Sequence, residues 1–147
     1  MHKLKILLLE DLAADAELIK KYLERNGLKF EATIAVSKIE LMLVLEEIEF
    51  DIVLADHSLS SIEALKMARA KDKNIPFILV GGETSEEESI KIMQKEAAND
   101  YILIDNLKRL PTAIRQAIKH RLTELGKELC ESKLLGKNIT ATPIDKN

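Results

Sequence analysis

Short apolar runs alternate along most of the chain with longer amphipathic stretches, and this alternation constrains the fold more than any other feature. The apolar runs occupy residues 6–9, 30–36, 52–55, 77–80 and 101–104. Four of them are apolar at consecutive positions, as in strands covered on both faces. The run from Phe30 to Val36 instead alternates, as in a half-buried edge strand. Repeated strand–helix units with short connections predict a parallel, doubly wound α/β sheet with helices on both faces.

Helix-start and helix-stop signals mark the amphipathic stretches. A stripe of apolar residues from Ala16 to Leu23 ends at Asn26-Gly27, a typical helix stop. Capping-box patterns predict further helix starts at Ser37 with Glu40, Ser60 with Glu63, Thr84 with Glu87 and Ser85 with Glu88. From about Leu107 to Leu135 the pattern predicts one long helix, with Pro111 tolerated only near its start.

Composition narrows the class of protein. A chain of 147 residues has room for one ordinary domain, and 46% apolar with 32% charged residues is typical of a globular protein. A net charge of −3 argues against a nucleic-acid module. A single cysteine excludes an intramolecular disulfide and a Cys-rich zinc site. No apolar run approaches the ~20 residues that span a bilayer. We therefore expect a soluble, cytoplasmic protein that binds neither nucleic acid nor membrane.

Acidic residues follow three of the predicted strands directly, and Asp105 is the one after the fifth. Glu10 and Asp11 come after the first strand and Asp56 after the third, which puts three carboxylates at two adjacent strand ends. A doubly wound sheet binds its ligand outside the carboxyl ends of its strands, so these carboxylates are expected to meet there. Carboxylates that gather repel one another unless a proton or cation enters, and oxygen ligands suit Mg²⁺. Acidic residues at strand ends that merely cap neighbouring helices are the alternative.

The chain from about Lys5 to Lys119 resembles the receiver domain of two-component response regulators. The resemblance rests on Leu9-Glu10-Asp11, on the segment from Phe50 to Asp56, on Ile75-Pro76 through Val80 and on Ala97 through Leu103. Each piece is weak alone, but the ordered combination is specific. The resemblance implies a flavodoxin-like, five-stranded sheet with the strand order 2-1-3-4-5.

The resemblance also assigns roles to individual residues. Asp56 takes the position of the phosphoacceptor, which receives its phosphoryl group from a histidine kinase or a phosphotransfer protein. Asp11 is implied as a direct Mg²⁺ ligand, Glu10 as an outer-sphere ligand, and the backbone carbonyl of Ser58 as a further ligand. Tyr101 takes the position of the family's switch aromatic.

Two of the family's functional positions depart from its pattern. The family usually has Ser or Thr at the end of the fourth strand, where this sequence has Gly81. It usually has Lys at the end of the fifth strand, where this sequence has Ile104. The departures predict a receiver that switches weakly when it is phosphorylated.

The last helix is longer than a receiver domain needs. We predict a receiver domain over residues 1–120, a helix extension over 121–135 and a linker or disordered tail over 136–147. The spacing of 4, 3 and 4 residues is typical of a short coiled-coil seam, formed by Ile118, Leu122, Leu125 and Leu129. A homodimer, or a connection to a downstream module, is expected through this seam, and ordinary packing on the sheet is the alternative.

Three functions remain open at this point. The leading hypothesis is a phosphoacceptor domain in signal transduction, without turnover chemistry of its own beyond self-phosphorylation and dephosphorylation. The second is a pseudo-receiver that binds a partner without phosphorylation. The third is a phosphohydrolase with an aspartate nucleophile, which is disfavoured because Asp56-His57-Ser58 lacks the second aspartate of an Asp-x-Asp motif.

Overall fold

Five parallel strands form a single sheet in the order β2-β1-β3-β4-β5, which confirms the expected fold class and strand order. The computed structural model describes residues 3–10, 13–56, 61–81 and 99–134, without the side chains of residues 61, 62 and 128–134. The strands are β1 (Leu4–Leu9), β2 (Phe30–Ala35), β3 (Ile52–Asp56), β4 (Phe77–Gly81) and β5 (Asp100–Leu103).

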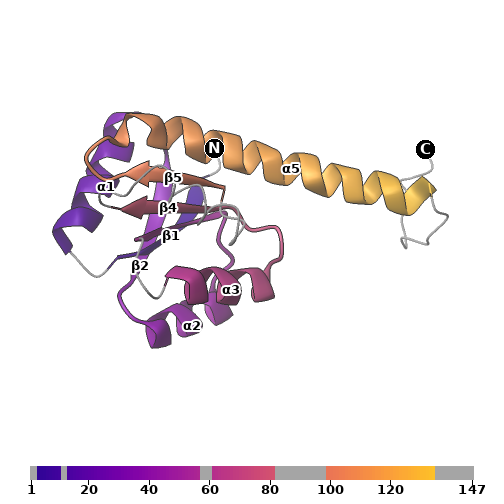
Figure 1. Ribbon diagram of the computed structural model, residues 1–147, viewed down its shortest axis with the longest axis horizontal. Helices are drawn as coiled ribbons and strands as arrows, with labels where there is room; N and C mark the ends of the chain where they lie inside the picture. Colours follow the sequence, from indigo (N-terminus) through magenta and orange to yellow (C-terminus); the bar gives the residue numbers. More distant parts are fainter. Residues whose placement is uncertain (1–2, 11–12, 57–60, 82–98, 135–147) are drawn as a thin grey trace.

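Helices cover both faces of the sheet (Figure 1). One apolar core lies under α1 (Ala13–Arg25) and α5 (Leu110–Leu134), and the other lies under α2 (Lys38–Glu47) and α3 (Ser61–Lys71). A short 3₁₀ turn, η1 (Leu107–Arg109), leads into α5. The helix predicted after Thr84 falls within residues 82–98, outside the described residues. No helix in the described ranges has both the length and the apolar composition needed to cross a membrane.

The consecutive apolar runs correspond to strands that are covered on both faces. All five residues of β4 are buried, and so are the first four of β3. β1 starts two residues before the predicted run, because Leu4 pairs with Phe30 and its N–H donates to the Lys29 carbonyl at 3.0 Å. β2 has only one fully buried residue, Ala35, and lies at the edge of the sheet, as its alternating sequence predicted.

Asn99 joins β4 to the beginning of β5. Its side-chain Oδ1 accepts a hydrogen bond from the N–H of Phe77 at 2.8 Å, and its own N–H donates to the Phe77 carbonyl at 2.7 Å. Arg69 of α3 adds a bond from Nε to the Ile75 carbonyl at 2.9 Å. Burial lowers the pKa of the Arg69 guanidinium. These bonds satisfy backbone groups at the start of a fully buried strand.

Two glycines in different backbone conformations give opposite predictions for the same substitution. Gly27 ends α1 with φ of +79°, while the N–H of Leu28 donates to the Leu23 carbonyl at 3.1 Å. Gly27→Ala is expected to lower the free energy of unfolding by about 1–2 kcal/mol, because a side chain disfavours this left-handed conformation. Gly126 lies inside α5, with nothing within 4 Å of the position of an added Cβ. Gly126→Ala is expected to increase helical content and to add up to about 1 kcal/mol.

Urea unfolding and far-ultraviolet circular dichroism of the two variants check this pair of predictions. Changes of the same sign in both variants would contradict it.

Candidate functional site

The register of the sheet brings the predicted site residues to one edge. Leu9 of β1 lies beside Ala55 of β3, so Glu10 and Asp56 follow at the same level of the sheet. Asp56 in turn lies beside Val80 of β4, one residue before Gly81. The carboxyl ends of three neighbouring strands therefore meet at Glu10, Asp56 and Gly81, as the sequence predicted.

Glu10 and Asp56 differ in exposure. Glu10 is 3% exposed and is the buried charged residue of the part of the chain that the structure describes. Its backbone N–H donates to the Ala35 carbonyl at 3.2 Å, so β2 holds the chain at this point. Asp56 is half-buried at the end of β3. The site therefore has one accessible and one buried carboxylate at the same level of the sheet, and an accessible carboxylate can act as a nucleophile.

Two of the predicted Mg²⁺ ligands can be located and two cannot. Asp11 and Ser58 lie outside the described residues. Within the described ranges, no group of three His, Cys, Asp or Glu side chains is close enough to hold a metal ion. Glu10 and Asp56 supply the oxygen donors that Mg²⁺ prefers, so the residues present fit this cation. The full ligand set stays a prediction.

A cation that the sequence did not predict lies close to this edge. The Lys38 ammonium, at the start of α2, forms an ion pair with Glu63 of α3 at 2.8 Å and lowers the pKa of Glu63. Both residues line a small cavity of about 40 Å³ beside Leu9, the residue before Glu10. The sequence predicted only that Glu63 would cap α3 with Ser60. An ion pair between two helices cannot be predicted from the sequence until the topology shows that α2 lies beside α3.

Ile104 continues the β4–β5 ladder beyond the end of β5. Its N–H donates to the Gly81 carbonyl at 2.8 Å. Its side chain packs against the core that α1 and α5 cover. Gly81 is buried at the end of β4. Neither position presents a hydroxyl or an ammonium at the carboxyl edge.

Solved structures share this arrangement of strands and helices. A receiver domain protein from Methanospirillum hungatei matches with a TM-score of 0.68 and 26% identity, over 84% of this chain and 99% of that one. The receiver domain of a sensor histidine kinase from Pseudomonas aeruginosa, solved with magnesium in its active-site cleft, gives 0.66 and 20%, over 80% and 99%. The chain has the receiver-domain fold.

Other comparisons add less. A structure described as the adenylate cyclase from Rhodopirellula baltica matches with a TM-score of 0.71 and 19% identity, over 93% of this chain and 100% of that one. At that identity the likeness concerns the fold. No protein-family model and no curated protein matches the sequence.

Tyr101, which the sequence predicted as the switch aromatic, is 8% exposed. Its ring belongs to the core beneath α2 and α3, in the same cluster as Leu79 and Ala64. Its carbonyl accepts a hydrogen bond from Arg109 Nη2 at 3.3 Å, and Arg109 also contacts Asp100 at 3.1 Å. The aromatic side chain therefore already occupies a buried position.

The predicted seam of α5 is only partly available for contacts with another molecule. Ile118 packs against the core under α1 and α5, and Leu125 lines a cleft against the body of the domain. Leu122 is 65% exposed. The side chain of Leu129 lies outside the described residues. Ile118 therefore packs on the receiver body, as the alternative interpretation of the spacing predicts, whereas Leu122 is open to solvent.

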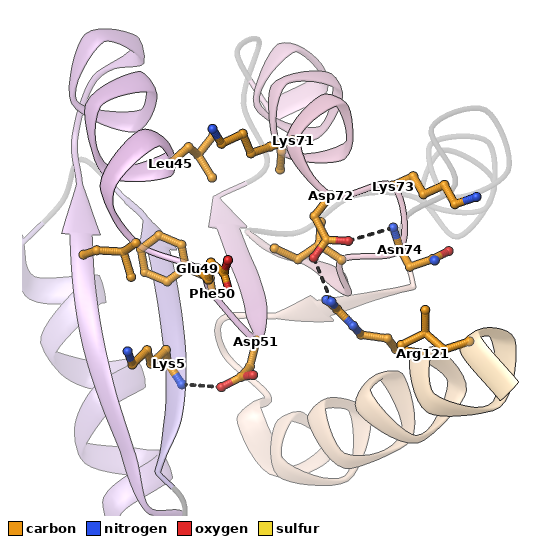
Figure 2. A pocket seen from close by; sticks show the side chains of 14 residues that line it. Lys5, Leu45, Glu49, Phe50, Asp51, Lys71, Asp72, Lys73, Asn74 and Arg121 are labelled. Carbon is orange, nitrogen blue, oxygen red and sulfur yellow. Dashed lines mark hydrogen bonds and ion pairs between the residues drawn. The ribbon is translucent and has the colours of Figure 1, made fainter. Parts of the chain in front are cut away.

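A cleft of about 750 Å³ opens at the amino-terminal ends of the strands, the edge opposite to Asp56. Figure 2 shows the side chains that line it. Two of its acidic side chains, Asp72 and Asp51, accept bonds from other residues of the lining. Arg121 of α5 contacts Asp72 at 2.8 Å, and Asp51 accepts a hydrogen bond from the Lys5 N–H at 2.8 Å. The Arg121–Asp72 pair fastens α5 to the loop after α3 near the point where the helix leaves the body. We assign this cleft a structural role.

Proposed function

We propose that this protein is a receiver domain of two-component signal transduction and that Asp56 accepts the phosphoryl group. The observation that carries the proposal is the position of Asp56, half-buried at the carboxyl edge of a receiver fold and level with the buried Glu10. A histidine kinase or a phosphotransfer protein is the donor that this role requires.

The chemistry needs little from the protein beyond positioning. A carboxylate oxygen of Asp56 attacks the phosphorus, the bond from phosphorus to the donor atom breaks, and an acyl phosphate forms. The leaving group departs with the electron pair of that bond and takes a proton from solvent. Bound Mg²⁺ would neutralise charge on the transferred group. Glu10, Asp11, Asp56 and the Ser58 carbonyl are the proposed ligands.

The role we propose is that of a phosphoacceptor and binding module rather than of an enzyme with a turnover substrate. Signal output then depends on contacts made by the surface of the domain. α5 is the proposed route to a downstream module or a second subunit, because the later part of this 25-residue helix extends beyond the sheet (Figure 1).

A pseudo-receiver is the second candidate, and Gly81 with Ile104 is the observation that favours it. A phosphoryl group on Asp56 would lack a hydroxyl from the end of β4 and an ammonium from the end of β5. Charge-assisted hydrogen bonds of this kind contribute about 1.5–3 kcal/mol each. Their loss weakens the response to phosphorylation more than it weakens the nucleophile.

Incubation with a small-molecule phosphodonor tests the proposal. We expect intact mass spectrometry to show one added phosphoryl group in the presence of Mg²⁺ and none after chelation. Asp56→Asn should abolish the addition, because the amide of asparagine is not a nucleophile toward phosphorus as a carboxylate is. Asp105→Asn is the matched control, since Asp105 is an exposed carboxylate after β5 at the same edge.

Failure of the wild-type protein to accept the group in millimolar Mg²⁺ would support the pseudo-receiver. Addition that survives Asp56→Asn would place the acceptor elsewhere.

A further inference from the structure

The solvent-facing side of α2 is apolar, which is unusual for a surface helix. Ile39, Met42 and Leu43 are 70%, 53% and 59% exposed. Their spacing of three and four residues puts them on one side of the helix, whereas Leu41 and Leu45 face the core. A helix that is apolar on all sides is normally buried, so this side is expected to be covered by another surface.

Ion pairs at both ends of α2 join this helix to α3. Lys38 bonds Glu63 at 2.8 Å at the amino end, and Glu46 bonds Lys71 at 3.3 Å at the carboxyl end. The orientation of α2 is set by Leu41 and Leu45, which are buried in the core beneath α2 and α3, so the apolar face stays outward. We use the name α2 face for Ile39, Met42 and Leu43 together with the neighbouring acidic residues Glu40, Glu46 and Glu47.

The rim of the α2 face is acidic. Glu46 and Glu47 follow Leu43 by three and four residues, and both are exposed. Glu40 lies at the other end, where its side chain accepts a hydrogen bond from the Val36 N–H at 2.8 Å. Lys71 offsets the charge of Glu46 in part, and Glu40 and Glu47 remain as acidic charges beside the apolar side chains.

A surface of complementary character lies on α5 of the same chain. Leu122 is 65% exposed, and Arg115 and Lys119 precede it by seven and three residues on the same side of the helix. We call these three residues the α5 face. It combines an exposed leucine with two basic residues, and the α2 face combines three apolar residues with acidic ones.

We propose that the α2 face of one copy of this protein docks on the α5 face of a second copy. Apolar contacts would cover Ile39, Leu43 and Leu122, while Arg115 and Lys119 would approach the acidic rim. The two faces belong to helices on opposite sides of the sheet (Figure 1), so the contact is heterologous and joins copies head to tail. The proposal does not depend on phosphorylation of Asp56.

The size of the two faces sets the strength of the contact. Each face is one helix side with a few apolar residues, on the order of a few hundred Å². Interfaces below about 1,200 Å² in total are weak or transient. We therefore expect association at high micromolar concentrations that weakens as ionic strength rises, because exposed charges are screened by salt.

Charge reversal in two separate variants tests the proposal by analytical ultracentrifugation. The α2 variant carries Glu46→Lys with Glu47→Lys, and the α5 variant carries Arg115→Glu with Lys119→Glu. Each alone should lose association by about tenfold or more, because like charges then face each other. A mixture of the two should associate again, since acidic α2 faces meet basic α5 faces and basic α2 faces meet acidic α5 faces.

The matched control for the α5 variant is Lys21→Glu with Arg25→Glu, which makes the same charge change at the same four-residue spacing on exposed positions of α1. It should associate as the wild type does. Three results would overturn the proposal: a wild type that remains monomeric at low salt and near-millimolar concentration, an α2 variant that associates normally, or a mixture that does not recover. An unaffected α2 variant would indicate pairing through α5 alone.

Discussion

With beryllofluoride and Mg²⁺, amide chemical-shift changes in the wild-type protein are expected to remain near Asp56 and not to reach Tyr101. In the receiver mechanism, a hydroxyl at the end of β4 moves toward the phosphoryl group and the aromatic ring on β5 follows. Gly81 has no side chain to move, and Tyr101 is already buried, with only 8% of the residue exposed. A ligand shifts a two-state equilibrium only by its differential affinity for the two states. The missing contacts therefore leave the population close to its resting value.

The double variant Gly81→Thr with Ile104→Lys should extend the response into β5. It restores two contacts of about 1.5–3 kcal/mol each. Its matched control is Gly81→Ala with Ile104→Met, which adds volume without a hydroxyl or an ammonium. Ile104 packs against the core under α1 and α5, so the lysine also has a cost in stability, which unfolding curves will show separately. Large wild-type shifts at Tyr101 would contradict the prediction.

Phe77→Ala is expected to lower the free energy of unfolding by about 3–5 kcal/mol, the largest single stability effect we anticipate. The Phe77 side chain is fully buried at the start of β4. It packs in the core beneath α2 and α3, and its backbone is held by Asn99. Alanine leaves a cavity there that this constrained backbone cannot easily close.

Urea denaturation measures the loss, with Phe30→Ala as the matched control. Phe30 is only half-buried on the edge strand β2, so its loss should be clearly smaller. Because a loss of 5 kcal/mol can unfold a marginal domain, Phe77→Leu provides a milder second variant. Equal losses at Phe30 and Phe77 would show that the two cores contribute alike.

The strands and their order could be predicted from the sequence, because a strand buried on both faces has apolar residues at consecutive positions. Consecutive apolar residues in β3 and β4 match strands with nearly every residue buried. The positions of Glu10 and Asp56 followed from the topology, since parallel strands end at one edge. Strand ends shifted by one or two residues, as at Leu4, where pairing with β2 rather than hydrophobicity decides the boundary.

Features that depend on contacts between distant segments could not be predicted. The pairs Lys38–Glu63 and Arg121–Asp72 join helices or loops that only the folded chain brings together. The seam of α5 shows a different difficulty, because a spacing of three and four residues fits both packing on the sheet and pairing with a second helix. Ile118 was assigned to a partner-facing seam with packing on the sheet as the alternative, and it packs against the core.

The unbroken course of α5 past its ion pair has an angular consequence. Each helical residue advances the chain by about 1.5 Å and turns it by about 100°. Beyond Arg121 the helix continues to Leu134 without interruption. The number of residues between Arg121, which the ion pair holds, and a surface on the helix therefore sets the orientation of that surface about the helix axis. One inserted residue would redirect such a surface by more than a quarter turn, whereas seven would displace it by about 10 Å with little rotation.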